Sequence, residues 1–269
     1  MQDAPSKAVL IAFRCTDPPT RLAGGQGGTW RSSAVVLKPM YDPDGAIWEA
    51  ETLSKLPQLG YRIAEPVCTS GGDWTCEGWT ASRFVDGICP KGSDLTERLA
   101  ASRALHADLV SIERPAHFDR ATDPWAIADE VAFGFADWSP DDRIASCLER
   151  FRRLQSPIIG HWQVIHGDLA GNFLLSPGQA PAIIDFTPKW SPRGFGEAVF
   201  GVDVCLWENI PLEIVVSALL PIERRLLPLA ASRRLLEIDT LHKMRSLSAD
   251  IFDQVSAYAG LADGLESLH

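Results

Sequence analysis

The chain has 269 residues and a mass of 29.4 kDa, which is enough for two domains or for one large domain with a cleft. Hydrophobic residues make up 46% and charged residues 22%, a globular composition that excludes an intrinsically disordered chain. There are 25 basic and 35 acidic residues, so the net charge is −10. Without a basic stripe, this balance argues against general nucleic-acid binding, and it leaves room for a cationic substrate.

The sequence contains no apolar run long enough to cross a membrane. The longest early run, 8–13, has only six residues, and no signal-peptide cleavage pattern follows it. The six cysteines lack paired CxxC spacing, which argues against zinc. We therefore expect free thiols and a reducing, cytoplasmic location.

The first 85 residues have the texture of a small β-rich lobe with one helix. Gly24–Gly28 has four glycines in five positions and lies in a turn between extended segments. We expect a helix or strand at 7–14, a strand at 34–38 ended by Pro39, a helix at 46–56, and two strands in 61–68 and 74–84 joined by a hairpin turn at 71–73.

From Asp94 onward the pattern is mainly helical. The apolar spacing predicts helices at 95–110, 125–135 and 141–154, a strand pair within 162–186, and further helices in 213–263. We place the boundary at the linker 85–87, which gives a first domain of 1–85 and a second of 86–269. The short basic clusters, of which Arg233-Arg234 is one, are interpreted as solvated helix faces.

The strongest chemical signal follows an apolar strand in the middle of the chain. His166-Gly167-Asp168 is followed by Asn172, a turn at 176–179, and a return strand that ends at Asp185. A short hairpin would bring Asn172 beside Asp185, with Asp168 in the loop just before. Such oxygen ligands suit Mg²⁺ completed by substrate phosphates, and a further carboxylate can accept a proton from a hydroxyl. Together these features match phosphoryl transfer.

These residues resemble the aminoglycoside phosphotransferase/choline kinase family. The resemblance rests on the His166–Asn172 catalytic loop, on Ile184-Asp185-Phe186, and on Lys38 in the third strand. It implies an α+β, two-lobed protein-kinase-like fold with a small β-rich N-lobe and a mainly helical C-lobe. It also implies that Asp168 is the catalytic base and that Asn172 and Asp185 hold Mg²⁺.

Two details of the resemblance are open. The family usually places the asparagine five residues after the catalytic aspartate, whereas here the gap is four, and Gly171 could absorb the tighter path. Asp203 looks like the helix aspartate that braces the catalytic loop, but an N-cap is the ordinary role of such a residue. Leu105-His106 resembles a helix-end pair of the family, and a structural role is the simpler interpretation of this histidine.

The nucleotide site predicted from the first lobe has three parts. Glycines let backbone N–H groups approach phosphates, so Gly25, Gln26, Gly27 and Gly28 are candidates, although a flexible hairpin turn is the alternative. Lys38 would bind the α- and β-phosphates, or it is simply a strand-end lysine. Trp79–Phe84 is the expected hinge against adenine.

A helix glutamate should hold Lys38, and the helical period selects Glu49. Glu49, Leu53 and Leu56 share one face, because offsets of four and seven bring side chains together, whereas Glu51 points about 200° away.

The acceptor site is the least defined part of the sequence. Acidic residues of the helical lobe could bind ammonium groups, although we expect most of them to form solvated faces. Four tryptophans could line a pocket, although we expect each of them to fill the core. The acids are Asp123, Asp129, Glu130, Asp137, Asp141 and Asp142, and the tryptophans are Trp125, Trp138, Trp190 and Trp207.

The sequence thus predicts a cytoplasmic small-molecule kinase that transfers the γ-phosphate of ATP (or GTP), with Mg²⁺, to a hydroxyl of a metabolite or aminoglycoside-like acceptor. Nucleic acid and membrane are not expected partners. A nucleotide-binding regulator without phosphoryl transfer is the alternative, kept open by the short catalytic loop. An oxygen-ligated metal hydrolase is a third possibility, but it has no use for Lys38 or the glycine loop.

Overall fold

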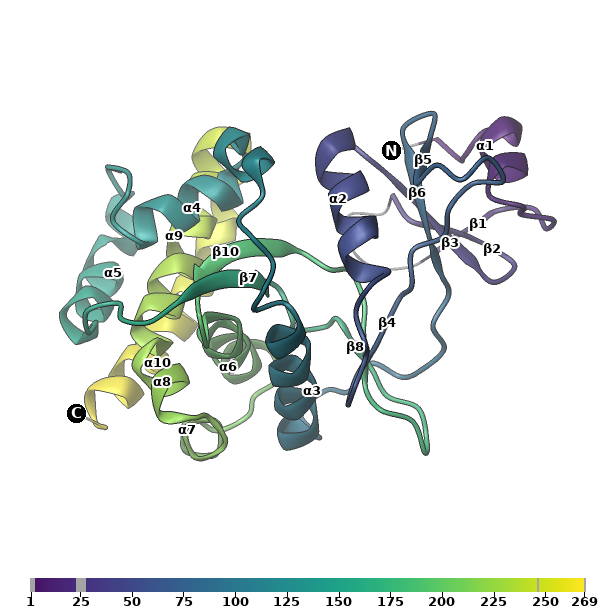
Figure 1. Cartoon of the computed structure of the whole chain (residues 1–269). Helices are drawn as coiled ribbons and strands as arrows, with labels where there is room; N and C mark the ends of the chain where they lie inside the picture. The colour runs from purple at the N-terminus through teal and green to yellow at the C-terminus, as the bar shows by residue number, and fades with distance from the viewer. Residues whose placement is uncertain (1–2, 23–27, 246, 269) are drawn as a thin grey trace. The chain divides into compact units, whose positions relative to one another are not determined.

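The computed structural model describes residues 3–22, 28–245 and 247–268. The chain forms two compact units, and both helices and strands contribute to its α+β architecture (Figure 1). The first unit comprises Met1–Cys89 and Phe173–Asp185, and the second comprises Pro90–Asn172 and Phe186–His269.

The first unit is built on an antiparallel sheet of order β1-β2-β3-β6-β5. Its strands are β1 (Thr20–Arg21), β2 (Trp30–Ser32), β3 (Val35–Pro39), β5 (Thr75–Cys76) and β6 (Trp79–Arg83). The segment 7–14, for which the sequence allowed a helix or a strand, contains a helix, α1 (Lys7–Ala12). Its N-cap Ser6 accepts a hydrogen bond from Val9 N. Val9 packs with Leu37 and Trp79 in the core of this unit.

The predicted hairpin differs from the observed one in its turn. The tight turn is Glu77–Gly78, between β5 and β6, and both residues have positive φ, which matches the twist of a two-residue hairpin. Residues 71–73 instead belong to a separate turn, where Thr69 N donates to Asp73 O.

Helix α2 (Pro43–Leu53) begins three residues earlier than the predicted Ala46. Pro43 takes the first helical turn, where a missing N–H costs nothing, so residues 43–45 are helix rather than an independent turn. A second small sheet in this unit has the order β4-β9-β8, formed by β4 (Arg62–Ile63), β8 (Phe173–Leu174) and β9 (Ala182–Ile183). Its β8–β9 hairpin is the one expected from the sequence, with Phe173 opposite Ile183.

The second unit is mainly helical and centres on α9 (Leu227–Arg245), which contacts α4, α5, α6 and α10. Its other helices are α3 (Leu95–Asp108), η1 (Ala116–Arg120), α4 (Pro124–Ala132), α5 (Asp142–Leu154), α6 (Phe195–Trp207), α7 (Leu212–Ala218), α8 (Pro221–Arg225), η2 (Ala249–Gln254) and α10 (Val255–Glu266). The predicted helices at 95–110, 125–135 and 141–154 are therefore present with ends shifted by a few residues.

One strand pair in this unit was not expected. The strand before the catalytic loop, β7 (Trp162–His166), pairs with β10 (Pro188–Pro192) and not with residues 182–186. β10 begins and ends with proline, a residue that usually argues against a strand. The two prolines are tolerated because β10 is an edge strand of a two-stranded ladder.

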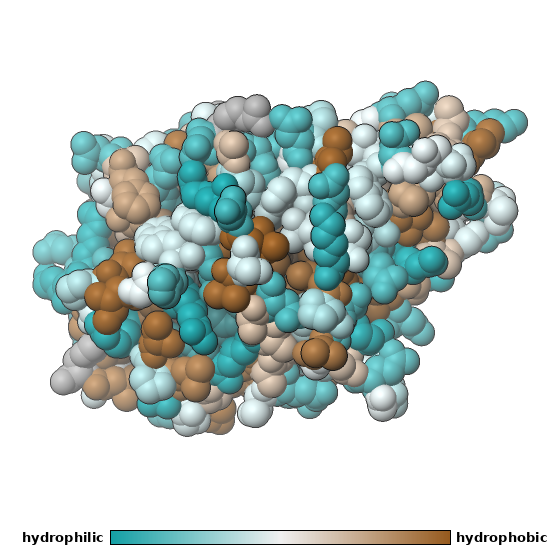
Figure 2. Space-filling model, in the orientation of Figure 1, coloured by the Kyte–Doolittle hydropathy of each residue, from teal (hydrophilic) through white to brown (hydrophobic). Residues whose placement is uncertain are grey.

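The surface shown in Figure 2 consists mainly of hydrophilic residues, with hydrophobic residues in small groups between them. Over the described part of the chain, no helix is both long and apolar enough to span a bilayer.

Candidate active site

In the first unit, Lys38 and Asp185 are joined although 147 residues separate them in sequence. Lys38 lies in β3, opposite Thr80 of β6, and its Nζ forms an ion pair with Asp185 Oδ1. Asp185 follows β9 and has a φ of 57°, in the left-handed region that non-glycine residues seldom occupy. Such backbone outliers concentrate at functional sites, because the surrounding structure must hold them.

Glu49 of α2 belongs to the same cluster. Burial raises the pKa of its carboxyl to about 7, while nearby Lys38 lowers it and Asp185 raises it. The helix face chosen from the period of α2 is thus the one that faces this lysine. The pairing of Lys38 with Asp185 leaves Glu49 as a carboxyl whose charge changes near neutral pH.

The glycine loop connects β1 and β2, next to the strand that carries Lys38. Leu22 N donates to Thr29 O at 3.0 Å, which brings the two ends of the loop together. Gly25, Gln26 and Gly27 lie outside the described residues, and Gly28 is the first described residue after them. Their phosphate-binding role stays a prediction.

In the second unit, the catalytic loop is fixed by its own backbone and side chains. Gly167 N donates to Thr187 O at 2.8 Å, and Asp168 N donates to His166 Nδ1 at 3.2 Å. A Cβ at position 167 would lie 2.5 Å from Cγ of Lys189, so a larger residue there would displace the Lys189 side chain.

The shortened stretch between Asp168 and Asn172 closes on itself. Asn172 Nδ2 donates to Asp168 O at 2.8 Å, and Gly171 has a φ of 79°. The glycine therefore adopts the left-handed conformation that a tight path requires. The asparagine side chain is thereby held against the backbone of the proposed base.

Arg234 of α9 is the residue that sequence analysis missed. Its Nη2 donates to Asp168 Oδ1 at 2.8 Å, its Nε donates to Asp203 Oδ1 at 2.9 Å, and its Nη1 donates to Glu237 Oε2 at 2.9 Å. Interpreting Arg233-Arg234 as a solvated face was wrong, because the two side chains are only 3% and 12% exposed.

Asp203 is not an N-cap, since it lies inside α6 with a side chain that is 3% exposed. Burial raises its pKa to about 6 despite the attraction of Arg234. Arg234 links Asp203 to Asp168, so the brace expected from Asp203 acts on the catalytic loop through the guanidinium. A single sequence contains no information that links residues 168, 203 and 234, so this role of Arg234 could not be predicted.

His106 anchors the strand that leads into the loop. Its Nε2 accepts from His166 N at 2.9 Å, so its proton must lie on Nδ1, which is 2.6 Å from Glu197 Oε1. The ring is buried between α3, α6 and β7, and this geometry supports a structural role. At the other end of the loop, the His166 ring packs edge-on against Phe186, with centroids 5.5 Å apart.

The predicted magnesium ligands were tested by their donor chemistry. No cluster of three or more His, Cys, Asp or Glu side chains suited to a metal occurs in the described ranges. A site of one carboxylate and one amide oxygen needs phosphates and water to complete it, as Mg²⁺ sites often do. Asn172 fits this role: its Nδ2 is used within the loop, and no described residue donates to its Oδ1.

The acidic residues proposed for the acceptor have other roles in the structure. Asp123 and Asp141 are N-caps that accept from backbone N–H groups, and Asp129 pairs with Arg233 and Lys189. The remaining three, Glu130, Asp137 and Asp142, are exposed. Of the four tryptophans, none is fully buried, and the expectation that Trp207 fills the core was wrong because it is 48% exposed.

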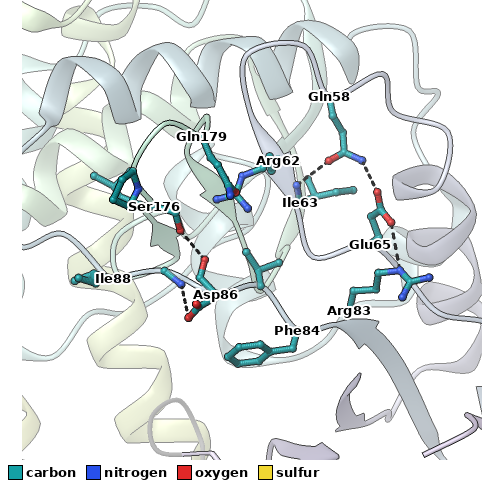
Figure 3. A pocket seen from close by; sticks show the side chains of 14 residues that line it. Gln58, Arg62, Ile63, Glu65, Arg83, Phe84, Asp86, Ile88, Ser176 and Gln179 are labelled. Carbon is teal, nitrogen blue, oxygen red and sulfur yellow. Dashed lines mark hydrogen bonds and ion pairs between the residues drawn. The ribbon is translucent and has the colours of Figure 1, made fainter. Parts of the chain in front are cut away.

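The first unit also contains a pocket of about 750 Å³ beside the predicted linker (Figure 3). It is lined by residues 83–88, by Gln58, Arg62, Ile63 and Glu65, and by residues of the hairpin turn near 175–179. Glu65 pairs with Arg83 on one side of the pocket, and Ser176 Oγ donates to Asp86 O at 2.8 Å. Arg83 N and Phe84 N already donate to Glu65 O and Ala34 O, so these two amides of the expected hinge are engaged within the protein.

No protein-family model and no curated protein matches the sequence. The structure is nevertheless similar to solved kinases. A microcompartment-associated aminopropanol kinase aligns with a TM-score of 0.65 at 15% identity over 96% of this chain and 95% of that one. The choline kinase LicA from Streptococcus pneumoniae aligns with a TM-score of 0.60 at 13% identity over 96% of both chains.

A third similar structure is a spectinomycin phosphotransferase in complex with ADP and spectinomycin. It has a TM-score of 0.59 and 15% identity over 94% of this chain and 92% of that one. At these identities the comparisons establish the fold. The chain has the protein-kinase-like fold of the aminoglycoside phosphotransferase and choline kinase structures, as the motifs predicted.

Proposed function

We propose that this protein is a small-molecule kinase that transfers the γ-phosphate of ATP to a hydroxyl group. The observation that carries the proposal is the cluster of Lys38, Asp185 and Glu49, three side chains from β3, the β9 end and α2. Phosphoryl transfer needs parts that hold a nucleotide, and the glycine loop, the lysine and the aspartate at the end of the hairpin are parts of this kind. The ADP bound to the similar spectinomycin phosphotransferase supports the same use of this fold.

Each residue has a chemical role in this proposal. Lys38 binds the α- and β-phosphates and is oriented by Glu49 once that carboxyl is ionised. Asn172 and Asp185 hold Mg²⁺, which supplies charge neutralisation on the phosphates when bound. Asp168 orients the acceptor hydroxyl through Oδ2 and accepts its proton, because Oδ1 is already engaged by Arg234.

ADP formation by the purified full-length protein tests this proposal. With Mg²⁺-ATP and pooled hydroxyl compounds, we expect ADP and a phosphorylated product, with a loss of at least 100-fold in Asp168→Asn, the scale of general-base catalysis. Lys38→Met should weaken ATP binding. Asp250→Asn and Lys55→Met are the matched controls, because both residues are exposed and outside the proposed site.

Two outcomes would contradict the kinase. Saturable ATP binding with no turnover in any pool would favour the nucleotide-binding regulator that the short loop kept open. Turnover without nucleotide would favour the metal hydrolase.

A further inference from the structure

The carboxylates around Asp168 are neutralised by cations of the chain itself. Asp129 Oδ1 accepts from Arg233 and its Oδ2 accepts from Lys189, at 2.7 and 2.8 Å. Glu237 Oε1 accepts from Trp125 Nε1 at 2.9 Å, and its Oε2 accepts from both arginines, Arg233 and Arg234.

The remaining two acids, Asp203 and Asp168, also accept hydrogen bonds from a cation of the chain. Both oxygens of Asp203 accept from Arg234, and Asp168 Oδ1 accepts from it as well. Four carboxylates therefore have eight oxygens, of which only Asp168 Oδ2 has no donor among the described residues. Four negative charges face three positive ones from Lys189, Arg233 and Arg234, so the net charge of −1 equals the charge of the proposed base alone.

Aromatic faces are the other feature that recognises ammonium groups, since a ring attracts a cation through its negative π-face. Two of the candidate tryptophans, Trp125 and Trp138, are already used in this way. The Arg245 guanidinium lies over Trp125 at 5.1 Å from the ring centroid, and Lys243 Nζ lies over Trp138 at 5.3 Å. Their indole N–H groups are also used, by Glu237 and Asp239.

If the acceptor had an ammonium group beside its reacting hydroxyl, the carboxylates and aromatic rings that usually bind ammonium groups would already be occupied. Asp168 Oδ2, the one oxygen of these four carboxylates without a donor among the described residues, must bind the hydroxyl, and Arg234 lies 2.8 Å from the other oxygen of the same carboxylate. Asp239 Oδ1 on α9 also lacks a partner among the described residues, but its side chain is fully buried. Burial alone would raise the pKa values of Asp129 and Glu237, but the neighbouring cations lower both, so these acids remain ionised and paired. An added ammonium would have to displace an internal arginine or lysine.

We propose that the acceptor of this kinase is a hydroxyl compound without an ammonium group, either uncharged or acidic. This inference rests on the proposed function and narrows its substrate class. It departs from the cationic acceptor that the acidic composition left possible, because the acidic side chains linked to the base through Arg234 and Arg233 are the ones that the chain neutralises.

Matched acceptor pairs that differ only in the ammonium group test the inference. Choline is compared with neohexyl alcohol, its uncharged carbon isostere, ethanolamine with ethylene glycol, and aminopropanol with propanediol. In assays of ADP formation by the full-length protein with Mg²⁺-ATP, we expect kcat/KM of the uncharged member to exceed that of its partner at least tenfold. Higher rates with the ammonium compounds would overturn the inference, and so would equal rates above background within the pairs.

A substitution at Lys189 tests the cause of the selectivity. Lys189→Met frees Asp129 Oδ2 and should shift the ratio within each pair toward the ammonium compound, whereas Lys91→Met, at an exposed position of the same unit, should not. An unchanged ratio in Lys189→Met would contradict the electrostatic explanation. Failure of the kinase proposal itself is distinguishable, because no compound in any pool would then lead to ADP formation, whether or not ATP binds.

Discussion

The ionisation of Glu49 gives a prediction that can be worked out from the structure. Its pKa rises from 4.5 to about 7 on folding, first because of burial. The folded state therefore keeps a proton that the unfolded state releases above pH 4.5. The sign follows directly: the contribution to stability is complete below pH 4.5 and is lost as the pH rises through about 7. The full loss is about 3 kcal/mol, at about 1.4 kcal/mol for each pH unit of difference.

The substitution Glu49→Gln removes this dependence, because glutamine has no proton to lose. Between pH ~5.5 and ~8.5 the wild type should lose about 2 kcal/mol of unfolding free energy through this group, and the variant should not. Urea unfolding followed by tryptophan fluorescence at both pH values measures the difference. Glu51→Gln is the matched control, since Glu51 is an exposed residue of the same helix. Equal pH dependence in wild type and Glu49→Gln would refute the argument.

The same group should control nucleotide use. With a pKa of about 7, roughly a tenth of the carboxyl is ionised at pH ~6 and roughly nine tenths at pH ~8. Only the ionised form can pair with Lys38, so ADP formation by the wild type should rise through pH 7. Glu49→Gln should lack this rise, and a rise with the same midpoint in the variant would assign it to another group.

Four further substitutions test the second unit and the hairpin. Arg234→Met should cost about 3–5 kcal/mol of unfolding free energy, because it leaves Asp203 buried without its partner. Adding Asp203→Asn should restore part of this loss. Urea unfolding measures both effects, and Arg225→Met, at an exposed position, is the control. Arg98→Met should cost a similar amount by the same assay, because Arg98 and Glu208 form an ion pair whose side chains are 1% and 8% exposed. Gly171→Ala and Gly178→Ala should each cost about 1–2 kcal/mol for a left-handed alanine, since both have positive φ and open space at Cβ. Only Gly171→Ala should also lower ADP formation, and equal effects on turnover would disprove a special role of the catalytic loop.

Much of this site could be predicted from short-range rules. The helical period of α2 selects Glu49 over Glu51, and the apolar strand before Pro39 places Lys38 at a strand end. The turn at 176–179 predicts the β8–β9 hairpin and hence the position of Asp185. Each of these inferences depends only on residues close together in the chain, where geometry is nearly fixed by the secondary structure.

The parts that could not be predicted depend on contacts between distant segments. Charged pairs on a helix are usually solvated, and α5 with its single apolar stripe follows that rule. Helix α9 does not, because it is surrounded by α4, α5, α6 and α10, and its arginines find carboxylates up to 104 residues away. The strand β10 escaped prediction for a similar reason: its flanking prolines oppose a strand, and only the pairing with β7 creates one.

The ion pair between Arg234 and Asp168 fixes the position of the proposed base. Arg234 Nη2 donates to Asp168 Oδ1 at 2.8 Å, and Arg234 is itself held by Asp203 and Glu237. This arrangement leaves Oδ2 as the oxygen of Asp168 that can meet a hydroxyl. Phosphoryl transfer through a loose transition state depends more on orientation of the attacking oxygen than on a strong base. A chain that fixes its aspartate in this way is therefore suited to this reaction, because a fixed carboxylate can orient the acceptor hydroxyl.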